Sequence, residues 1–156
     1  MKPKISCRET GATAVEMALL APIFLLVLLA LVELSLMFFA TLTMQYTVRE
    51  GARFAITGQK SLESNPSNQQ RYRAIIQKMS DNSLGFYDKL APVISVNGKA
   101  YSGTAYSDAM FGAAGAISVI KLDCEWVVTT PLLSQFFADG KYHFAVAATM
   151  RNEFFP

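Results

Sequence analysis

Near the N-terminus, a glycine and a glutamate stand out by their types and their spacing. Gly11 precedes a long apolar run, and Glu16 is the fifth residue after it. Glycine has no side chain to obstruct a close approach to its backbone. An unpaired carboxylate is costly in a membrane, by about 3 kcal/mol at the bilayer centre. Glu16 therefore needs either a cationic partner or contact with water.

The other residues with catalytic potential are isolated from one another in the sequence. His143 is the single histidine and falls on the polar phase of an alternating segment, so we expect it to face solvent. Cys124 falls on the apolar phase of another such segment, where a free thiol is usually buried and inert. The sequence contains no histidine–cysteine cluster at metal-ligating spacing and no glycine-rich phosphate loop. We therefore predict no enzymatic activity, no metal site and no cofactor.

The composition is more apolar than that of a typical soluble domain. Apolar residues make up 52% of the chain and charged residues 17%, whereas soluble domains average about 25% charged residues. The formal net charge of +2 is too small to indicate nucleic-acid binding. Between residues 12 and 40 only Glu16 and Glu33 are ionisable. The apolar excess is therefore concentrated in this segment.

The apolar segment is long enough to cross a bilayer. A membrane-spanning helix needs about 20 residues, and an ordinary secretory signal has an apolar region of only about 7–15 residues. The bulky residues at its end, Met37–Phe39, do not fit a signal peptidase site, so we expect residues 12–40 to be retained as a transmembrane helix. A hydrocarbon layer that begins near Val15 ends near Leu34. This places Glu33 at the outer boundary, where we expect it to reach water.

Basic residues set the expected orientation of this helix. Three of them precede the apolar run and place the N-terminus in the cytoplasm by the positive-inside rule: Lys2, Lys4 and Arg8. Arg49 and Arg53 follow the run and weaken this argument. They lie beyond the span, however, and Glu50 partly offsets them. The chain from about Thr43 onward is therefore expected outside the cytoplasm.

The predicted helix continues well past the membrane. Apolar residues recur every four positions and form one ridge: Met44, Val48, Ala52 and Ile56. Gly58 follows as a natural C-terminal cap. A helix over residues 12–57 would be about 68 Å long at a rise of about 1.5 Å per residue, roughly twice the hydrocarbon thickness. Residues 41–58 should therefore pack against an external domain.

Residues 59–156 are predicted to form that external domain, beginning with a helix and a hairpin. A polar linker over residues 59–65 is followed by an amphipathic helix over residues 66–80, in which apolar residues recur at helical spacing. Asn97-Gly98 then separates two short β-type runs, Val93–Val96 and Lys99–Tyr101. This dipeptide is the strongest short signal for a β-hairpin.

The rest of the external domain is predicted to be a loop and two long strands. Residues 105–116 are small and aperiodic, which indicates a loop. Residues 120–128 and 142–150 alternate between apolar and polar side chains, as strands with one buried face do. The short connection between them predicts an antiparallel pair. The predicted fold class is α+β, in which a long N-terminal transmembrane helix continues into a small domain with an antiparallel sheet packed on helices.

The segment Arg8–Leu19 resembles the cleavage site of type IV prepilins. In that family a membrane aspartyl protease, the prepilin peptidase, cuts after the glycine and leaves the apolar segment on the mature chain. The narrower resemblance is to TadE-like proteins of tight-adherence (Flp-type) pilus systems. Three matches carry it: Gly-x-x-x-Val-Glu-Met-Ala-Leu from Gly11 with Pro22 close behind, the stretch Tyr46–Arg53, and the terminal stretch Met150–Glu153.

The resemblance implies a pilin-like protein with a leader of residues 1–11 and cleavage between Gly11 and Ala12. The mature chain would stay in the bacterial inner membrane, with its external domain periplasmic or extracellular. Glu16 would meet the Ala12 ammonium of a neighbouring subunit. The implied partners are the bilayer, the prepilin peptidase, other pilin-like subunits and the pilus assembly platform. The external domain is large compared with the very short major pilins, which implies a minor pilin or pseudopilin that supports pilus assembly.

Two alternatives stay open from the sequence. One is a related subunit, either a TadF-like protein, which shares the first motif, or a secretion-system pseudopilin. The other is an uncleaved bitopic receptor whose external domain binds a ligand. The receptor needs neither the glycine nor the glutamate of the first motif. The N-terminus of the chain in its native membrane distinguishes the receptor from the pilin-like proteins.

Overall fold

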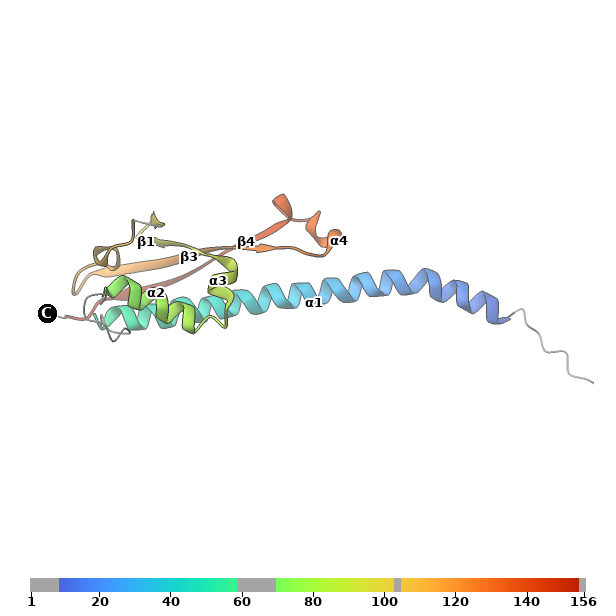
Figure 1. Cartoon of the computed structure of the whole chain (residues 1–156), viewed down its shortest axis with the longest axis horizontal. Coiled ribbons are helices and arrows are strands. Elements are labelled where there is room, and N and C mark those ends of the chain that lie inside the picture. The colour runs from blue at the N-terminus through green and yellow to red at the C-terminus, as the bar shows by residue number, and fades with distance from the viewer. Residues whose placement is uncertain (1–8, 59–69, 103–104, 155–156) are drawn as a thin grey trace, which may run out of the picture.

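One long helix lies along a small antiparallel sheet in the computed structural model, which describes residues 9–58, 70–102 and 105–154 (Figure 1). The arrangement confirms the predicted α+β fold class. In chain order, the elements are α1 (Glu9–Ile56), α2 (Arg71–Asp81), α3 (Phe86–Leu90), β1 (Val93–Val96), β2 (Lys99–Tyr101), the 3₁₀ turn η3 (Asp108–Phe111), β3 (Ile117–Val127), α4 (Pro131–Ser134), the 3₁₀ turn η4 (Ala138–Gly140) and β4 (Lys141–Arg151).

Helix α1 confirms the predicted continuation of the membrane helix into the external domain. It runs without interruption from Glu9 to Ile56 and continues through Pro22. Gly58, with φ of +67°, follows the helix end in the left-handed conformation expected of a C-terminal cap. The first half of α1 projects away from the rest of the molecule, whereas the second half lies against the sheet (Figure 1).

Helix α2 packs closely on the second half of α1. The predicted amphipathic helix is found over Arg71–Asp81, and the earlier part of the prediction, with the 59–65 linker, lies outside the described residues. Met79 on its apolar face is fully buried. A Cβ atom at Gly51 of α1 would lie 2.3 Å from Cγ of Met79. The missing side chain at Gly51 therefore lets the two helices approach each other.

The sheet has the strand order β2-β1-β3-β4, and every neighbouring pair is antiparallel. The predicted hairpin is confirmed, since Asn97 and Gly98 have positive φ angles of 50° and 81° between β1 and β2. Positive φ at both central residues is what a type I′ turn requires. The predicted pairing of the two long strands is also confirmed, with Cys124 opposite Phe144.

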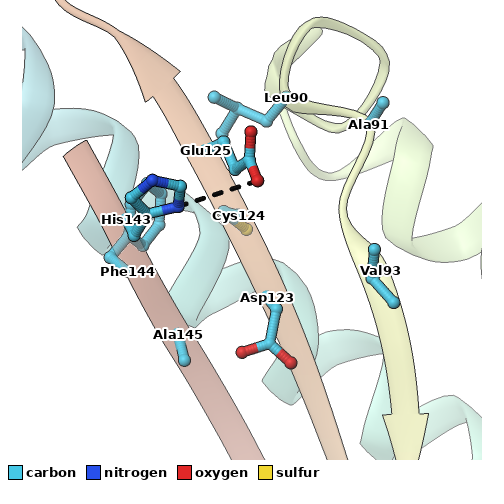
Figure 2. A pocket seen from close by; sticks show the side chains of 9 residues that line it. All are labelled: Leu90, Ala91, Val93, Asp123, Cys124, Glu125, His143, Phe144 and Ala145. Atoms are coloured by element: carbon cyan, nitrogen blue, oxygen red, sulfur yellow. Dashed lines mark ion pairs between the residues drawn. The ribbon is translucent and has the colours of Figure 1, made fainter. Parts of the chain in front are cut away.

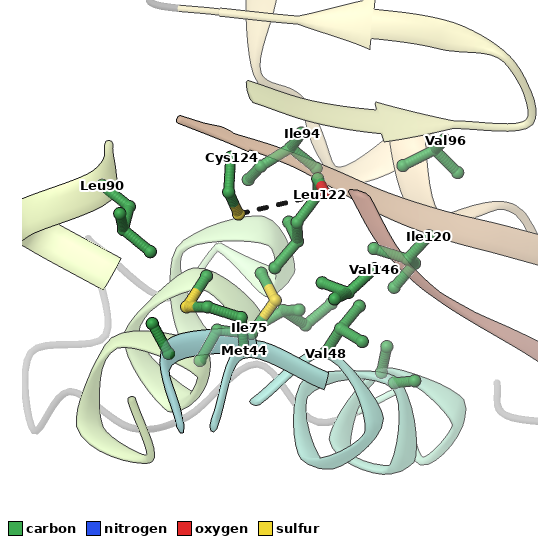
Figure 3. Packing of buried hydrophobic residues seen from close by; sticks show 14 of the residues in the cluster. Met44, Val48, Ile75, Leu90, Ile94, Val96, Ile120, Leu122, Cys124 and Val146 are labelled. Carbon is green, nitrogen blue, oxygen red and sulfur yellow. Dashed lines mark hydrogen bonds between the residues drawn. The ribbon is translucent and has the colours of Figure 1, made fainter. Parts of the chain in front are cut away.

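The hydrophobic core lies between one face of the sheet and helices α1 and α2 (Figure 3). The predicted ridge on α1 forms its helical side, with Met44 and Val48 both fully buried. Strand β3 forms the opposite side because alternate residues face inward, as predicted. Its buried residues are Ser118, Ile120, Leu122, Cys124 and Trp126. Every second residue of β3 and about every fourth residue of α1 therefore face the same core.

The segment predicted as a loop over residues 105–116 contributes to this core. It contains η3, in which Met110 and Phe111 are buried. Ser118 and Asn152 both donate hydrogen bonds to the Phe111 carbonyl, at 3.1 and 2.9 Å. These polar contacts hold a short apolar turn that has no periodicity of its own.

The connection between β3 and β4 projects beyond the end of the sheet. It contains α4 and η4 and runs beside α1 toward the N-terminal half of that helix (Figure 1). Thr130 stands at the N-terminal end of α4 and Pro131 in its first position, where proline suits a helix because its missing N–H is not needed. This connection is the part of the external domain that lies nearest the apolar half of α1.

Candidate membrane and assembly site

The first half of α1 exposes an almost continuous apolar surface. Leu19 is 67% exposed and Phe24 69% exposed. Among the described residues, α1 is the one helix long and apolar enough to cross a membrane. Buried core helices of soluble proteins share that composition, but these side chains are not covered by the protein. The helix and its exposed surface fit a single-pass membrane protein.

The residues of the predicted processing site lie at the start of this surface. Gly11 is in the first turns of α1, and nothing lies within 4 Å of a Cβ atom built on it. Ala12 and Glu16 are exposed. They are four positions apart, so they share one face of the helix about 6 Å apart along its axis. The orienting basic residues, Lys2, Lys4 and Arg8, lie outside the described residues.

Glu33 corrects an expectation from the sequence. We expected a side chain that reaches water, but Glu33 is only 7% exposed. Its carboxylate accepts hydrogen bonds from the backbone N–H groups of Thr129 and Thr130, the latter at 2.8 Å. These two residues follow β3 and lie almost 100 positions later in the chain, so no local pattern reveals the contact. Glu33 therefore ties the β3–β4 connection to α1.

A second polar junction, which sequence reasoning missed, secures the other end of α1. Arg71 donates hydrogen bonds to the carbonyls of Ala55 and Gly112, at 2.8 and 2.7 Å. The N–H of Glu153 donates to the carbonyl of Ile56 at 3.0 Å. Carbonyls at a helix end have no partner within the helix. Arg71 donates to that of Ala55, and Glu153 donates to that of Ile56. The sequence did contain a sign of this junction, because the charged Arg71 shares the apolar face of α2 with Ile75.

Asn152 explains why the terminal stretch of the chain matters structurally. It continues the inward-facing phase of β4 and is 3% exposed. Its side-chain amide donates to the carbonyls of Phe111 and Ala113, both at 2.9 Å. A polar residue in the apolar phase of a strand could have indicated such a contact. The stretch Met150–Glu153 therefore fastens the end of the sheet to η3 and α1.

The external domain also has a shallow cleft, which is where a receptor would be expected to bind a ligand (Figure 2). Its volume is about 550 Å³, and it lies between the α3–β1 junction and strands β3 and β4. The acidic residues of the cleft already have cationic partners. Glu125 lies 2.7 Å from Lys141 and 3.7 Å from His143, which is exposed as predicted. Asp123 lies 2.6 Å from Lys121.

The electrostatics of this cleft follow from those pairs. The hydrogen bond from Lys141, together with its charge, lowers the pKa of Glu125, and the same contact raises the pKa of Lys141. Both side chains are about half exposed, so solvent screens the pair. Within the described ranges no cluster of histidine, cysteine or acidic side chains is arranged to hold a metal. The cleft therefore offers paired surface charges rather than a set of converging catalytic groups.

Comparison with known proteins bears on the N-terminal helix. Residues 11–53 match the family model described as TadE-like protein. The match covers two of the three stretches that carried the resemblance and stops short of the sheet. Searches of curated proteins and of solved structures gave no match. The match confirms the resemblance inferred from the sequence over residues 11–53, which are less than half of the chain.

Proposed function

We propose that the protein is a minor pilin or pseudopilin that supports assembly of a tight-adherence pilus. The TadE-like match supports a protein associated with such a pilus system. The observation that carries the finer proposal is the exposed segment Gly11–Glu16 at the start of an uncovered apolar helix. In this proposal the protein acts through assembly and has no enzymatic activity.

The first part of the proposal is cleavage by a prepilin peptidase between Gly11 and Ala12. Gly11 is helical here, so a peptidase that needs an extended backbone must unwind the first turn of α1. Glycine makes this easier, because in a helix interior it is about 1 kcal/mol less favourable than alanine. Among the described residues, no other atom crowds the Cβ position of Gly11, which favours access by a protease.

The intact mass of the chain purified from its native membrane tests this cleavage. A mass that begins at Ala12 is expected in a strain with a working prepilin peptidase, and the full mass in a strain without it. Gly11→Val should block processing severely, whereas Gly11→Ala should reduce it mildly. An N-terminus at Met1 in the peptidase-positive strain would remove the proposal and favour the uncleaved receptor.

The second part of the proposal assigns subunit assembly to Glu16. When α1 packs among other subunits, Glu16 loses hydration, and the Ala12 ammonium of a neighbour restores a partner. The exposed position of both residues leaves them open to such a contact. Their spacing on one face also allows contact within one chain, so subunit association is the informative readout. Removing one member of a buried pair costs about 3–5 kcal/mol, and we expect a smaller cost near the membrane surface.

Glu16→Gln tests this role because it removes charge and keeps shape. We expect normal cleavage, insertion and abundance, with co-purification of other pilin-like subunits weakened by about 1–3 kcal/mol, or roughly 5- to 150-fold. Glu50→Gln is the matched control, since it removes a carboxylate from the same helix outside the span. Undiminished association and wild-type piliation in the Glu16→Gln strain would leave Glu16 as an interfacial bystander.

The third part of the proposal is topology, with the N-terminus cytoplasmic and the external domain periplasmic or extracellular. The support is Lys2, Lys4 and Arg8 ahead of the apolar run. A phosphatase fused after Pro156 should be active, because it works only when exported. An active cytoplasmic reporter at that position, with an inactive phosphatase, would reverse the orientation. A TadF-like or pseudopilin role predicts the same topology and differs in the partners that co-purify.

A further inference from the structure

The level of the β3–β4 connection along α1 is fixed by Glu33. The two hydrogen bonds from Thr129 and Thr130 to its carboxylate hold the start of the connection against this one position of the helix. A hydrocarbon layer of about 20 residues that begins near Val15 ends near Leu34. The connection therefore starts at the membrane boundary that faces the external domain.

From this boundary the connection points into the membrane rather than away from it. Figure 1 shows α4 beside α1, on the side of the sheet that faces the N-terminal half of the helix. A bilayer that surrounds the exposed apolar half of α1 must also meet whatever lies beside that half. The connection lies at this end of the sheet because β3 ends and β4 begins there.

The surface of the connection fits a lipid environment. Phe136 is 79% exposed and Leu132 is 47% exposed, and Val127 at the end of β3 is 67% exposed. Exposed large apolar side chains that gather at one end of a domain mark a site of contact with lipid or protein. Asp139 is the single ionisable residue between Thr129 and Gly140. One carboxylate at the tip is compatible with shallow insertion and opposes deep insertion.

Several backbone N–H groups of the connection are paired within it. Ser134 donates to the carbonyl of Thr130 at 2.9 Å, and Phe136 donates to that of Leu133 at 2.9 Å. Gly140 donates to the carbonyl of Phe137 at 3.1 Å. An irregular segment pays a large penalty in lipid when its N–H groups lack partners. The three N–H groups named here are paired, which lowers the cost of moving this segment out of water.

An amphipathic residue stands directly behind the apolar tip. Tyr142 is half-buried next to the connection, whereas Trp126 opposite it is 7% exposed and belongs to the core. Tyrosine is enriched at the level of lipid headgroups. Two cations lie at the same end of the sheet. The ammonium of Lys89 lies 4.6 Å from the centre of the Trp126 ring, and Lys141 begins β4 and pairs with Glu125 at 2.7 Å.

We infer that the β3–β4 connection inserts shallowly into the leaflet that faces the external domain and is a second membrane anchor of the protein. The partner is the lipid bilayer, since the apolar tip lies beside the exposed apolar half of α1. Two anchors fix the tilt of the external domain relative to the membrane, which a single helix leaves free to rotate. The inference rests on α1 as a membrane span and does not depend on cleavage at Gly11.

Tryptophan fluorescence in vesicles tests this inference with the full chain. The native tryptophan is removed by Trp126→Phe, and a single tryptophan is then placed by Phe136→Trp, Ile117→Trp or Phe24→Trp. Ile117 is the matched control, because it is 65% exposed but lies at the opposite end of β3. Phe24 reports on the membrane span itself. The vesicles carry lipids brominated near either the start or the end of the acyl chain.

We expect the Phe136→Trp variant to be quenched severalfold more by bromine near the start of the chain than the Ile117→Trp variant. The Phe24→Trp variant should be quenched by bromine deeper in the chain. Equal, weak quenching of the Phe136 and Ile117 variants, with strong quenching of the Phe24 variant, overturns the second anchor and keeps the span. An unquenched Phe24 variant overturns both. Blue-shifted but unquenched emission at position 136 that reverts on dilution into more lipid identifies a second copy as the occupant and also overturns the inference.

Discussion

The first half of α1 and its second half carry similar apolar side chains but differ in what covers them. Leu25 and Leu28 in the first half are 56% and 42% exposed, whereas Met44 and Val48 in the second half are fully buried. The second half has polar residues on its outer face, such as Arg49 and Arg53. Residues 17–32 of the first half are apolar on every side. A helix that is apolar all round suits an apolar environment, and the bilayer is such an environment.

The two glutamates of α1 extend this comparison. Glu16 lies in the uncovered half and is exposed, whereas Glu33 lies at the junction of the halves and is held by two backbone N–H groups. One carboxylate is available to a partner outside the chain, and the other already has its partners within it. The same residue type therefore has an intermolecular role in our proposal at one position and an intramolecular role at the other.

The largest expected effect comes from truncating a buried side chain in the covered half of α1. Met44→Ala removes a fully buried side chain and should lower the free energy of unfolding of the external domain by about 2–5 kcal/mol. Urea unfolding of the full chain in detergent, followed by the fluorescence of Trp126, measures the change. Leu28→Ala is the control in the uncovered half, where the loss should stay below about 0.5 kcal/mol. Equal losses of unfolding free energy in the two variants would contradict the conclusion that only the second half of α1 packs against the external domain.

The next effect separates the two glutamates. Glu33→Gln removes a charge that two N–H groups donate to, and hydrogen bonds to charged groups contribute about 1.5–3 kcal/mol. We expect the β3–β4 connection to detach from α1, with faster amide hydrogen exchange at Thr129 and Thr130. Glu16→Gln should leave exchange in the monomeric chain unchanged. Fast exchange at both threonines in the wild-type chain would show that the Glu33 contact does not persist.

The fold was predictable where the signal is local. The Asn97-Gly98 turn, the inward phase of β3 and the ridge on α1 all follow from residue type and periodicity within a few positions. The contacts of Glu33, Arg71 and Asn152 were not predictable, because each joins segments far apart in the chain. A polar residue on an apolar face, as Arg71 is on α2, indicates that a partner exists but does not identify it.

At the proposed processing site the sequence is more informative than the structure. Gly11, Ala12 and Glu16 were found from spacing and family resemblance, and the structure places them on an exposed helix. Their proposed roles depend on a peptidase and on other subunits, which lie outside the chain. A folded monomer contains no contact that would reveal those roles. The sequence was therefore more informative than the structure at this site, and the reverse holds for Glu33.

A smaller effect is expected at Gly51, where the covered half of α1 meets α2. A Cβ atom there would lie 2.3 Å from Cγ and 2.8 Å from Sδ of Met79. Overpacking of this kind costs about 1–3 kcal/mol, and the better helix propensity of alanine returns up to about 1 kcal/mol. Gly51→Ala should therefore destabilise the external domain by about 1–2 kcal/mol in the same urea experiment. Gly11→Ala, with open space around it, should not, and a stabilised Gly51→Ala variant would mean that Met79 yields freely.

The smallest effect on stability, but a clear chemical readout, is expected at Cys124 on the sheet face that covers α1. Burial, with a smaller contribution from the charge of Asp123, raises the pKa of its thiol to about 12. An exposed thiol has a pKa of about 8.5, so at pH 8 the buried thiolate should be scarcer by a factor on the order of 1,000. Because the folded state holds the neutral thiol, its contribution to stability is complete below about pH 8.5 and is lost as the pH rises toward 12.

Thiol modification measures how well the sheet is sealed against the covered half of α1. In a Cys7→Ala background, Cys124 should resist a thiol reagent at pH 8 and react at the rate of a free thiol after denaturation in urea. Cys124→Ala combined with Ile117→Cys is the matched control, because Ile117 is 65% exposed on the opposite face of the same strand and lies at the end away from the membrane. A one-residue slip of β3 would exchange these faces and expose the whole inward set. Rapid modification of native Cys124, at a rate close to that of the Ile117→Cys control, would therefore show that the sheet does not cover α1 in the register described. Slow modification that becomes fast in the Met44→Ala variant would show that the ridge on α1 closes this face of the sheet.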